Sequence, residues 1–207
     1  MILNPDLEAY IHSLLPPRDE LLAEMEAYAA EHRVPIIGPA VATMLATLVR
    51  LTGARRIFEL GSAIGYSTIW LARAAGEGAE VHYSDGSPEN AARALSYFRR
   101  AGLADRITMH TGDALTALAT TKDEFDFIFN DVDKHGYPAV LEAAPARLRV
   151  GGLFLTDNTL WHAKVLNPQT PDDHGVVEFN RKVFSRQDLD TFMSPLRDGV
   201  VVARKRY

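Results

Sequence analysis

The feature that most constrains the fold is a regular alternation, after residue 55, of short apolar segments with segments of helical spacing. The short segments are rich in β-branched and aromatic residues, and glycines or polar turns bound them. The alternation predicts strands at 56–60, 79–84, 106–110, 125–130 and 152–156, and helices near 66–75, 88–101, 114–119 and 137–147. Repeats of this kind indicate an α/β fold in which a doubly wound, mostly parallel sheet carries helices on both faces.

The two ends of the chain depart from this alternation. Residues 1–53 show helical spacing with proline interruptions and predict helices that precede the first strand. At the other end, the sequence predicts a helix and two strands joined by an Asp198-Gly199 turn. Their expected bounds are 175–186, 190–194 and 199–204. Since 207 residues can bury one core, we expect a single domain with a helical segment (1–53) and an α/β core (54–207).

Composition excludes several classes of protein. The net charge of −5 argues against a broad electrostatic grip on nucleic acid, without excluding it. The absence of cysteine excludes disulfides, thiolate metal sites and a cysteine nucleophile. The N-terminal stretch lacks the basic region and apolar core of a signal peptide, and no apolar run approaches the roughly 18–20 residues of a membrane helix. We therefore expect a soluble, cytoplasmic protein.

A glycine turn joins the first predicted strand to its helix. Gly61 can adopt backbone angles that other residues resist, and Gly65 would let the backbone approach a ligand closely. Their G-x-x-x-G spacing is not the dinucleotide-binding G-x-G-x-x-G. Glu59 is polar at the end of an otherwise apolar strand, where a cationic or amine-bearing ligand could use it.

Acidic residues follow the second and third predicted strands. In a doubly wound sheet, ligands bind beyond the carboxyl ends of the strands, so such residues are candidates for a site. Asp85 lies 24 residues after Gly61, where a carboxylate can accept hydrogen bonds from both hydroxyls of a ribose. Alternatively, it is a solvent-facing residue that starts a turn. Asp113 could accept from the exocyclic amine of a purine or could cap the next helix.

Oxygen-bearing side chains follow the fourth and fifth predicted strands. Asp131 comes after the fourth strand, and Asp157-Asn158 comes after the fifth. Neighbouring parallel strands lie about 4.8 Å apart, so these groups could converge on one ion. Two carboxylates and one amide oxygen suit Mg²⁺, Mn²⁺ or Ca²⁺ rather than Zn²⁺. The alternative is that they are ordinary residues at loop starts.

Lys134 and Trp161 could complete a catalytic site. Near a divalent cation, the ammonium form of Lys134 would be disfavoured, and its amine could act as a general base. Otherwise Lys134 forms a salt bridge with Asp133 or another neighbour. Trp161 is either a flat wall for an aromatic substrate or a buried core side chain. Three histidines lack metal-ligand spacing, and we expect them to be solvated: His135, His162 and His174.

Together these segments resemble the cation-dependent, S-adenosylmethionine-dependent O-methyltransferases of the catechol and caffeoyl-coenzyme A type. The likeness runs from about Pro39 to Lys205. It rests on the glycine segment Glu59–Ser67, the acidic segments Phe125–Lys134 and Asp157–Trp161, and the terminal Pro195 and Asp198-Gly199. The two acidic segments in this order are more specific than the glycine segment. Departures from the family pattern occur at 39–42, Val132 and Thr156.

The resemblance implies a fold, a set of ligands and a function for each candidate residue. It implies a seven-stranded Rossmann-like sheet with the last strand antiparallel, and commonly a homodimer. It implies cofactor contacts from Glu59, Gly61, Ser67, Asp85, Asp113, Ala114 and Asp131. It also implies metal ligation by Asp131, Asp157 and Asn158, catalysis by Lys134 together with Asp131, and a substrate contact at Trp161.

The expected reaction is methyl transfer from S-adenosylmethionine to one hydroxyl of a small vicinal aromatic diol or its ester, assisted by a divalent cation. Three alternatives stay open. The acceptor could be a hydroxylated uridine in transfer RNA, or the chain could bind the cofactor without transferase activity. A nicotinamide-dependent reductase is disfavoured by the glycine spacing.

Overall fold

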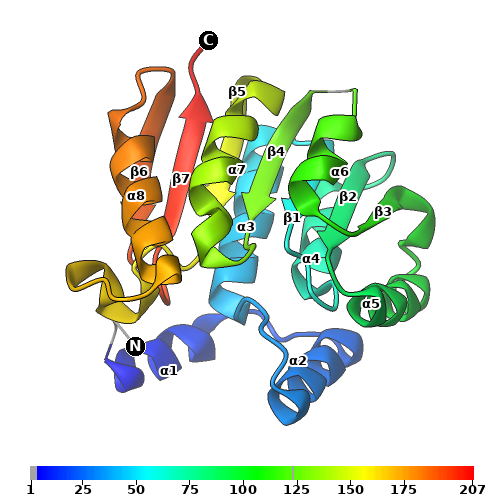
Figure 1. Cartoon of the computed structure of the whole chain (residues 1–207). Helices are drawn as coiled ribbons and strands as arrows, with labels where there is room; N and C mark the ends of the chain where they lie inside the picture. The colour runs from blue at the N-terminus through cyan, green and yellow to red at the C-terminus, as the bar shows by residue number, and fades with distance from the viewer. Residues whose placement is uncertain (1–3, 123) are drawn as a thin grey trace.

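The computed structural model describes residues 4–122 and 124–207, and it contains the doubly wound sheet that the sequence predicts (Figure 1). Residues 1–3 and residue 123 lie outside the described part. Residues 1–3 belong to the N-terminal stretch that is predicted not to be a signal peptide. The sheet has seven strands in the order β3-β2-β1-β4-β5-β7-β6. The strands are Arg56–Leu60 (β1), Glu80–Asp85 (β2), Ile107–Thr111 (β3), Phe125–Asn130 (β4), Leu148–Thr156 (β5), Leu189–Ser194 (β6) and Val200–Lys205 (β7).

The directions of the strands confirm the predicted Rossmann-like topology. Strands β1 to β5 pair in parallel, and the last strand, β7, runs antiparallel to both of its neighbours. One strand boundary differs by more than one residue: β5 begins at Leu148 rather than at residue 152. Leu148 already pairs with Phe125 across an irregular register, so the strand starts before the Gly151-Gly152 pair.

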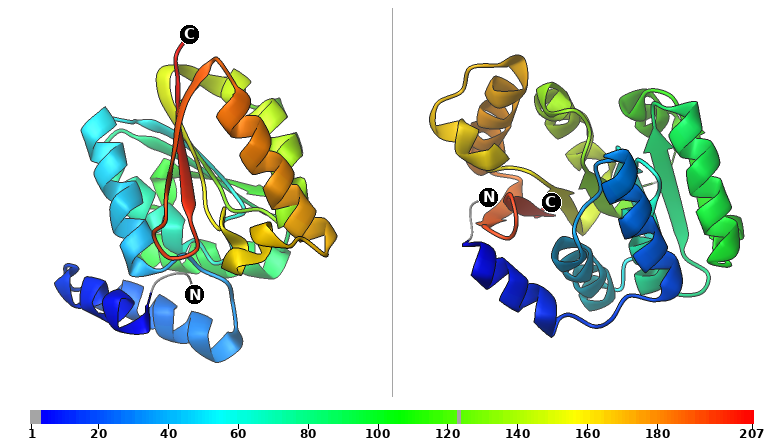
Figure 2. Two further views of the ribbon diagram at one scale, coloured as in Figure 1. Left: turned by 90° about the vertical axis from the view of Figure 1, so that its left-hand side faces the viewer. Right: turned by 90° about the horizontal axis from the view of Figure 1, so that it is seen from below.

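Helices cover both faces of the sheet (Figure 2). One face packs against α3, α4 and α5 through residues such as Val41, Ile69 and Phe98. The other packs against α6, α7 and α8 through residues such as Leu118 and Phe179. These helices are Pro39–Thr52 (α3), Tyr66–Ala75 (α4), Pro88–Arg100 (α5), Ala114–Thr120 (α6), Tyr137–Ala143 (α7) and Pro171–Ser185 (α8).

Two further helices, α1 (Pro5–Leu14) and α2 (Glu20–His32), precede α3, as the N-terminal pattern predicts. They lie below the sheet in Figure 1, at the end where the parallel strands terminate. This placement puts the N-terminal segment beside the edge of the sheet at which ligands bind in such folds. In the described part of the chain, no helix combines the length and the apolar composition needed to cross a membrane.

Two helices have bounds that differ from the predicted ones by more than one residue. α8 begins at Pro171 rather than near residue 175, because the Thr170 side chain and the Asp173 side chain cap its first turn reciprocally. That capping box is readable in the sequence as T-P-D-D. The predicted helix at 137–147 ends at Ala143, and a 3₁₀ turn, Pro145–Arg147, follows it. A proline restricts the residue before it, so the regular helix stops there.

Candidate active site

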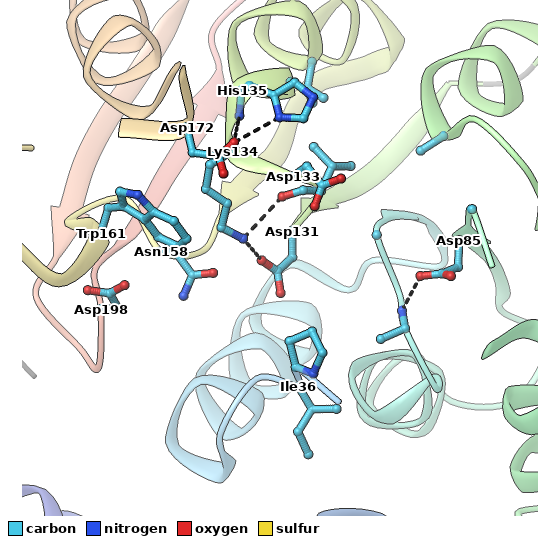
Figure 3. A pocket seen from close by; sticks show the side chains of 18 of the residues that line it. Ile36, Asp85, Asp131, Asp133, Lys134, His135, Asn158, Trp161, Asp172 and Asp198 are labelled. Carbon is cyan, nitrogen blue, oxygen red and sulfur yellow. Dashed lines mark hydrogen bonds and ion pairs between the residues drawn. The ribbon is translucent and has the colours of Figure 1, made fainter. Parts of the chain in front are cut away.

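A cavity of about 880 Å³ lies at the carboxyl ends of the parallel strands (Figure 3). Asp85 stands at one side of the cavity, Trp161 and Asn158 stand at the other, and Asp131 lies between them. A volume of this size accommodates a cofactor together with a small acceptor. Eight of the predicted site residues line it: Gly61, Asp85, Asp113, Ala114, Asp131, Lys134, Asn158 and Trp161.

Three other predicted residues do not line the cavity. Glu59 and Asp157 have no exposed surface, and Ser67 is 6% exposed. Glu59 and Ser67 act on the site through the residues that they contact, because they do not reach the cavity. Asp157 lies next to Asn158 and beside Asp131, and both of those residues line the cavity.

The glycine turn after β1 is shaped by packing within the chain. A Cβ added to Gly61, whose φ is +81°, would lie 2.5 Å from the carbonyl oxygen of Asp131. A Cβ added to Gly65 would lie 2.5 Å from the ring of Phe98. The expectation that Gly65 makes room for a ligand is therefore wrong, because a side chain of α5 takes that space. Gly61 allows the close approach of β1 to the loop that carries Asp131.

Replacing Gly61 by alanine should lower the free energy of unfolding by about 3 kcal/mol or more, because the added methyl group meets a backbone that cannot retreat. Gly53→Ala is the matched control, since Gly53 also has a positive φ but nothing lies within 4 Å of its added Cβ. It should cost only about 1 kcal/mol. Urea unfolding measures both. Equal losses would mean that backbone strain, and not the approach to Asp131, requires Gly61.

Asp85 holds the loops on both sides of β2. Its Oδ2 accepts a hydrogen bond from the Ala63 amide at 2.9 Å. Its Oδ1 accepts from the Ser87 amide at 2.9 Å and from Asn90 Nδ2 at 3.1 Å. The carboxylate is thus fixed at the cavity wall, and each oxygen still has acceptor capacity for a ligand. Asp85 is not the simple solvent-facing turn residue of the alternative interpretation.

Asp113 caps α6, as one of the two interpretations predicts. Its Oδ1 accepts hydrogen bonds from the amide and the hydroxyl of Thr116, each at 2.7 Å. These bonds, the one from the Thr116 side chain first, lower the pKa of the carboxyl group. Because Asp113 also lines the cavity, its other oxygen is available to a ligand.

Glu59 is a buried acid at the end of β1. Its Oε2 accepts a hydrogen bond from the Thr68 hydroxyl, whereas its Oε1 is buried without a partner. Burial raises the pKa of Glu59 to about 7, against the opposing effect of neighbouring hydroxyls. The side chain therefore supports the turn from within and is partly protonated near neutral pH.

Glu59→Gln should stabilise the protein at pH 8. The pKa of Glu59 is higher in the folded state than in the unfolded state. The stability that its protonated form contributes is therefore fully present below about pH 4.5 and is lost as the pH rises to about 7. A shift from 4.5 to about 7 corresponds to roughly 3 kcal/mol. Glutamine keeps the acceptor for Thr68 and does not ionise. Urea unfolding at pH 5 and pH 8 should show the gain only at pH 8, and the exposed Glu31→Gln should show none. A wild-type pH profile in Glu59→Gln would contradict this expectation.

Asp131 and Asp157 emerge side by side from β4 and β5. Their preceding residues, Asn130 and Thr156, are register partners, and the Asp157 amide donates to the Asn130 carbonyl at 3.1 Å. Burial and then the charge of Asp131 raise the pKa of Asp157 to about 7. The two carboxylates are therefore close enough to interact electrostatically, and their convergence on one ion stays a prediction.

The donor set at this point fits a hard cation. Asp157 Oδ1 is buried and has no hydrogen-bond partner, which leaves a carboxylate oxygen free for a ligand. Asn158 has a φ of +55°, a conformation that asparagine tolerates, and it lines the cavity beside Asp131. In the described part of the chain, no three His, Cys, Asp or Glu side chains form a metal-binding group. A cation here would therefore need the amide oxygen of Asn158 as its third protein ligand.

Lys134 forms a salt bridge, but with Asp131 rather than with Asp133. Its Nζ lies 2.8 Å from Asp131 Oδ1 and 3.3 Å from the Val132 carbonyl oxygen (Figure 3). The same Nζ lies 5.5 Å from the centre of the Trp161 ring. The side chain is only 12% exposed, so the amine faces the cavity in a largely dry environment.

Trp161 is a half-buried wall of the cavity and not a fully buried core residue. Its Nε1 donates a hydrogen bond to Asp173 Oδ1 at 2.8 Å, which fixes the indole against α8. Four residues of this loop have a positive φ: Asn158, Trp161, His162 and Ala163. Such strained backbone persists where surrounding structure imposes it, commonly at functional sites.

The histidines are exposed, as predicted, but two of them also line the cavity. His135 pairs with Asp172 at 3.0 Å, and His162 lies 3.7 Å from Asp198. His174 is exposed outside the cavity.

Arg197 is a cavity residue that the sequence did not indicate. It lies between β6 and β7, and its Nη1 is 3.5 Å from Asp157 Oδ2. Its Nη2 donates to the Ile36 carbonyl oxygen at 3.1 Å. The residues are far apart in the sequence, so no local pattern signals the contact. Only the position of Arg197 inside the terminal hairpin segment could have drawn attention to it.

The fold and the cavity define the class of this protein. A solved O-methyltransferase from Bacillus cereus, in a complex with SAH, matches it with a TM-score of 0.89, 30% identity and coverage of 97% of both chains. The sheet topology is therefore that of a Rossmann-like methyltransferase.

Sequence comparison narrows the class to a family. A family model described as O-methyltransferase matches residues 12–206. A catechol O-methyltransferase from Niastella koreensis is 33% identical over 192 residues, which cover 89% of this chain and 87% of that protein. A caffeoyl-CoA O-methyltransferase from Eucalyptus globulus is 29% identical over 210 residues, 93% of this chain and 85% of that protein. The chain belongs to the O-methyltransferase family, which confirms the resemblance predicted from its sequence.

Proposed function

We propose that this enzyme transfers a methyl group from S-adenosylmethionine to one hydroxyl of a small vicinal aromatic diol, with a divalent cation in the site. One observation carries the proposal. Asp131 and Lys134 line the middle of a single cavity, between the Asp85 side and the side formed by Asn158 and Trp161. A donor and an aromatic acceptor can therefore meet beside paired carboxylates and an amine.

The Asp85 side of the cavity is the proposed donor site. The carboxylate of Asp85 can accept from ribose hydroxyls, and the free oxygen of Asp113 can accept from the amine of the purine. Gly61 and Ala114 contribute backbone to the same wall. Because Glu59 and Ser67 are buried, we assign them support of the glycine turn rather than direct contact.

Asp131, Asp157 and Asn158 would hold the cation, which when bound supplies positive charge that favours the ionised form of an acceptor hydroxyl. The buried, unpartnered oxygen of Asp157 supports this assignment. Asp131 has a second role in the proposal, because it orients the Lys134 amine at 2.8 Å.

Lys134 accepts the proton of the reacting hydroxyl at its Nζ. The amine lies within the cavity wall and faces the ring of Trp161, so a diol stacked on the indole places its hydroxyl near the base. The enclosing walls hold the acceptor in line with the methyl donor and exclude water. Orientation and preorganised charge then supply most of the rate enhancement.

The decisive experiment combines the enzyme, S-adenosylmethionine, Mg²⁺ and catechol, with detection of methylated product by mass spectrometry. We expect turnover that a chelator abolishes and excess Mg²⁺ restores. Turnover that is insensitive to the chelator would refute the cation, and donor binding without any methyl product would favour a non-catalytic binder. Methyl incorporation into transfer RNA alone would favour the hydroxyuridine alternative, with binding steeply weakened by salt.

The proposal extends to assembly and compartment. We propose that residues 1–207 form one domain, that the enzyme works as a homodimer, and that it acts in the cytoplasm on a small molecule. Light scattering coupled to size-exclusion chromatography measures the mass of the particle. A monomer at micromolar concentration would contradict the homodimer and leave the proposed chemistry intact.

A further inference from the structure

One lysine and one arginine are among the residues that line the cavity, and they have different surroundings. Lys134 is held by Asp131 at 2.8 Å. Arg197 lies on the Trp161 side, because it contacts Asp157 and its loop is hydrogen-bonded to Thr159 and Leu160, which precede Trp161. Because the proposed acceptor occupies this side, Arg197 faces the acceptor rather than the donor.

The guanidinium of Arg197 is weakly engaged. Its contact with Asp157 Oδ2 is 3.5 Å long, at the outer limit of a hydrogen bond. Its second partner is the neutral carbonyl of Ile36 at 3.1 Å. These contacts use two of the five N–H groups of the guanidinium, and 38% of the side chain is exposed. Arg197 therefore has donors and charge to spare for an anionic ligand.

The loop that carries Arg197 is fixed to the loop that carries Trp161. The amide of Thr159 donates to the Gly199 carbonyl at 2.9 Å, and the amide of Leu160 donates to the Asp198 carbonyl at 2.8 Å. A Cβ on Gly199 would lie 2.6 Å from Leu160 Cγ, so the two loops approach as closely as glycine allows. Arg197 itself has a φ of +53°, an uncommon conformation for arginine. Its side chain is thus presented to the acceptor side by a constrained backbone.

We propose that Arg197 is a specificity-determining residue that binds a carboxylate carried by the aromatic diol. This inference rests on the proposed function. A planar guanidinium with unused donors pairs with a carboxylate through two parallel hydrogen bonds. Since Arg197 adjoins Asp157, the carboxylate has to lie close to the diol, as in a dihydroxybenzoate. An acceptor with an ammonium group in the same place is repelled.

Three acceptors of matched shape test the inference: 3,4-dihydroxybenzoate, 3,4-dihydroxybenzaldehyde and 3,4-dihydroxybenzylamine. They carry a negative, a neutral and a positive group at one position. The wild-type enzyme should show kcat/KM values in the order acid, aldehyde, amine. Arg197→Asn should lower the ratio of kcat/KM for the acid to kcat/KM for the aldehyde about tenfold. This factor is what a charged, hydrogen-bonded pair contributes at a partly exposed site, where solvent screens the charges.

The variants are chosen to keep the fold. Asparagine tolerates a positive φ better than most residues, so Arg197→Asn removes the guanidinium without added strain. Arg197→Lys keeps the charge and loses the planar guanidinium, so it should lower the same ratio severalfold. It replaces the asparagine variant in the test if that variant does not fold. Arg204→Asn is the control, because Arg204 lies on β7 outside the cavity and is 55% exposed. It should leave the ratio within about twofold.

A binding measurement separates this inference from the proposed function. Calorimetric titration of 3,4-dihydroxybenzoate into the enzyme with S-adenosylhomocysteine and Mg²⁺ involves no turnover. Its Kd should weaken about tenfold in Arg197→Asn, and that of the aldehyde should not change. Equal use of acid and aldehyde by the wild type, or an unchanged ratio in folded Arg197→Asn, would overturn the inference while leaving the proposed function intact. Absence of turnover with every acceptor would instead refute the proposed function.

Discussion

Replacing Asp157 by asparagine should lower kcat/KM for methyl transfer about 10³-fold and, at the same time, stabilise the metal-free protein at pH 8. The loss follows because the proposed cation site keeps only one carboxylate, Asp131, and charge stabilisation at a reacting oxygen is commonly worth a factor of 10²–10³ or more. The gain follows because Asp157 is buried beside a like charge and has an oxygen without a partner.

The pH dependence of this stabilisation has a definite sign. The pKa of Asp157 is raised from 3.8 to about 7 in the folded protein. The stability that protonated Asp157 contributes to the folded state is therefore fully present below about pH 4 and is lost as the pH rises to about 7. Asparagine does not ionise, so the variant should gain about 1–3 kcal/mol over the wild type at pH 8 and little at pH 5.

Urea unfolding in the presence of a chelator measures the stability, and steady-state kinetics at saturating Mg²⁺ measures the activity. The control Asp105→Asn changes an exposed aspartate outside the cavity and should alter neither quantity. An inactive variant that is also unstable would indicate a structural fault. An Asp157→Asn enzyme with wild-type turnover would remove Asp157 from the cation site.

Lys134→Met should reduce kcat about 10²–10³-fold and leave the affinity for the methyl donor unchanged. The reason is that Lys134 acts on the acceptor hydroxyl, and general base catalysis typically contributes a factor of 10²–10⁴. Steady-state kinetics measures kcat, and calorimetric titration measures the affinity for the methyl donor.

The matched control for this variant is Lys164→Met. Lys134 and Lys164 place their Nζ atoms 5.5 Å and 5.3 Å from the centre of the Trp161 ring, but Lys164 is half exposed and does not line the cavity. Loss of a cation near the indole is thus common to both variants, and only Lys134→Met should lose activity. Since Lys134 also neutralises Asp131, Mn²⁺ affinity is measured in parallel. Full activity restored by excess Mn²⁺ would assign Lys134 to cation binding instead of base catalysis.

Much of the fold was readable from local signals. The period of the apolar residues and the capping and turn residues located each strand of the sheet, because these signals depend on neighbours within a few positions. The boundary errors arose where a local signal had two meanings. A Gly-Gly pair is ordinarily a turn signal, yet Gly151-Gly152 lies within β5. The capping box at Thr170 lies in a polar segment that was predicted to be a loop.

The site was predictable to the extent that chain order decides it. Residues that follow parallel strands must gather at one edge of the sheet, so chain order alone places Asp85, Asp131 and Asn158 at the edge where the cavity lies. The reason is topological, because a parallel sheet sends all of its carboxyl ends in the same direction.

The sequence by itself therefore determined the α/β class, the segments that form the strands, and most of the side chains at the ligand-binding edge of the sheet. Only the tertiary structure decided that Glu59 and Asp157 are buried, that Gly65 makes room for Phe98, and that Arg197 reaches Asp157 from the terminal hairpin. Burial and contact between distant residues depend on how whole elements pack against one another, and no property of a local segment encodes that.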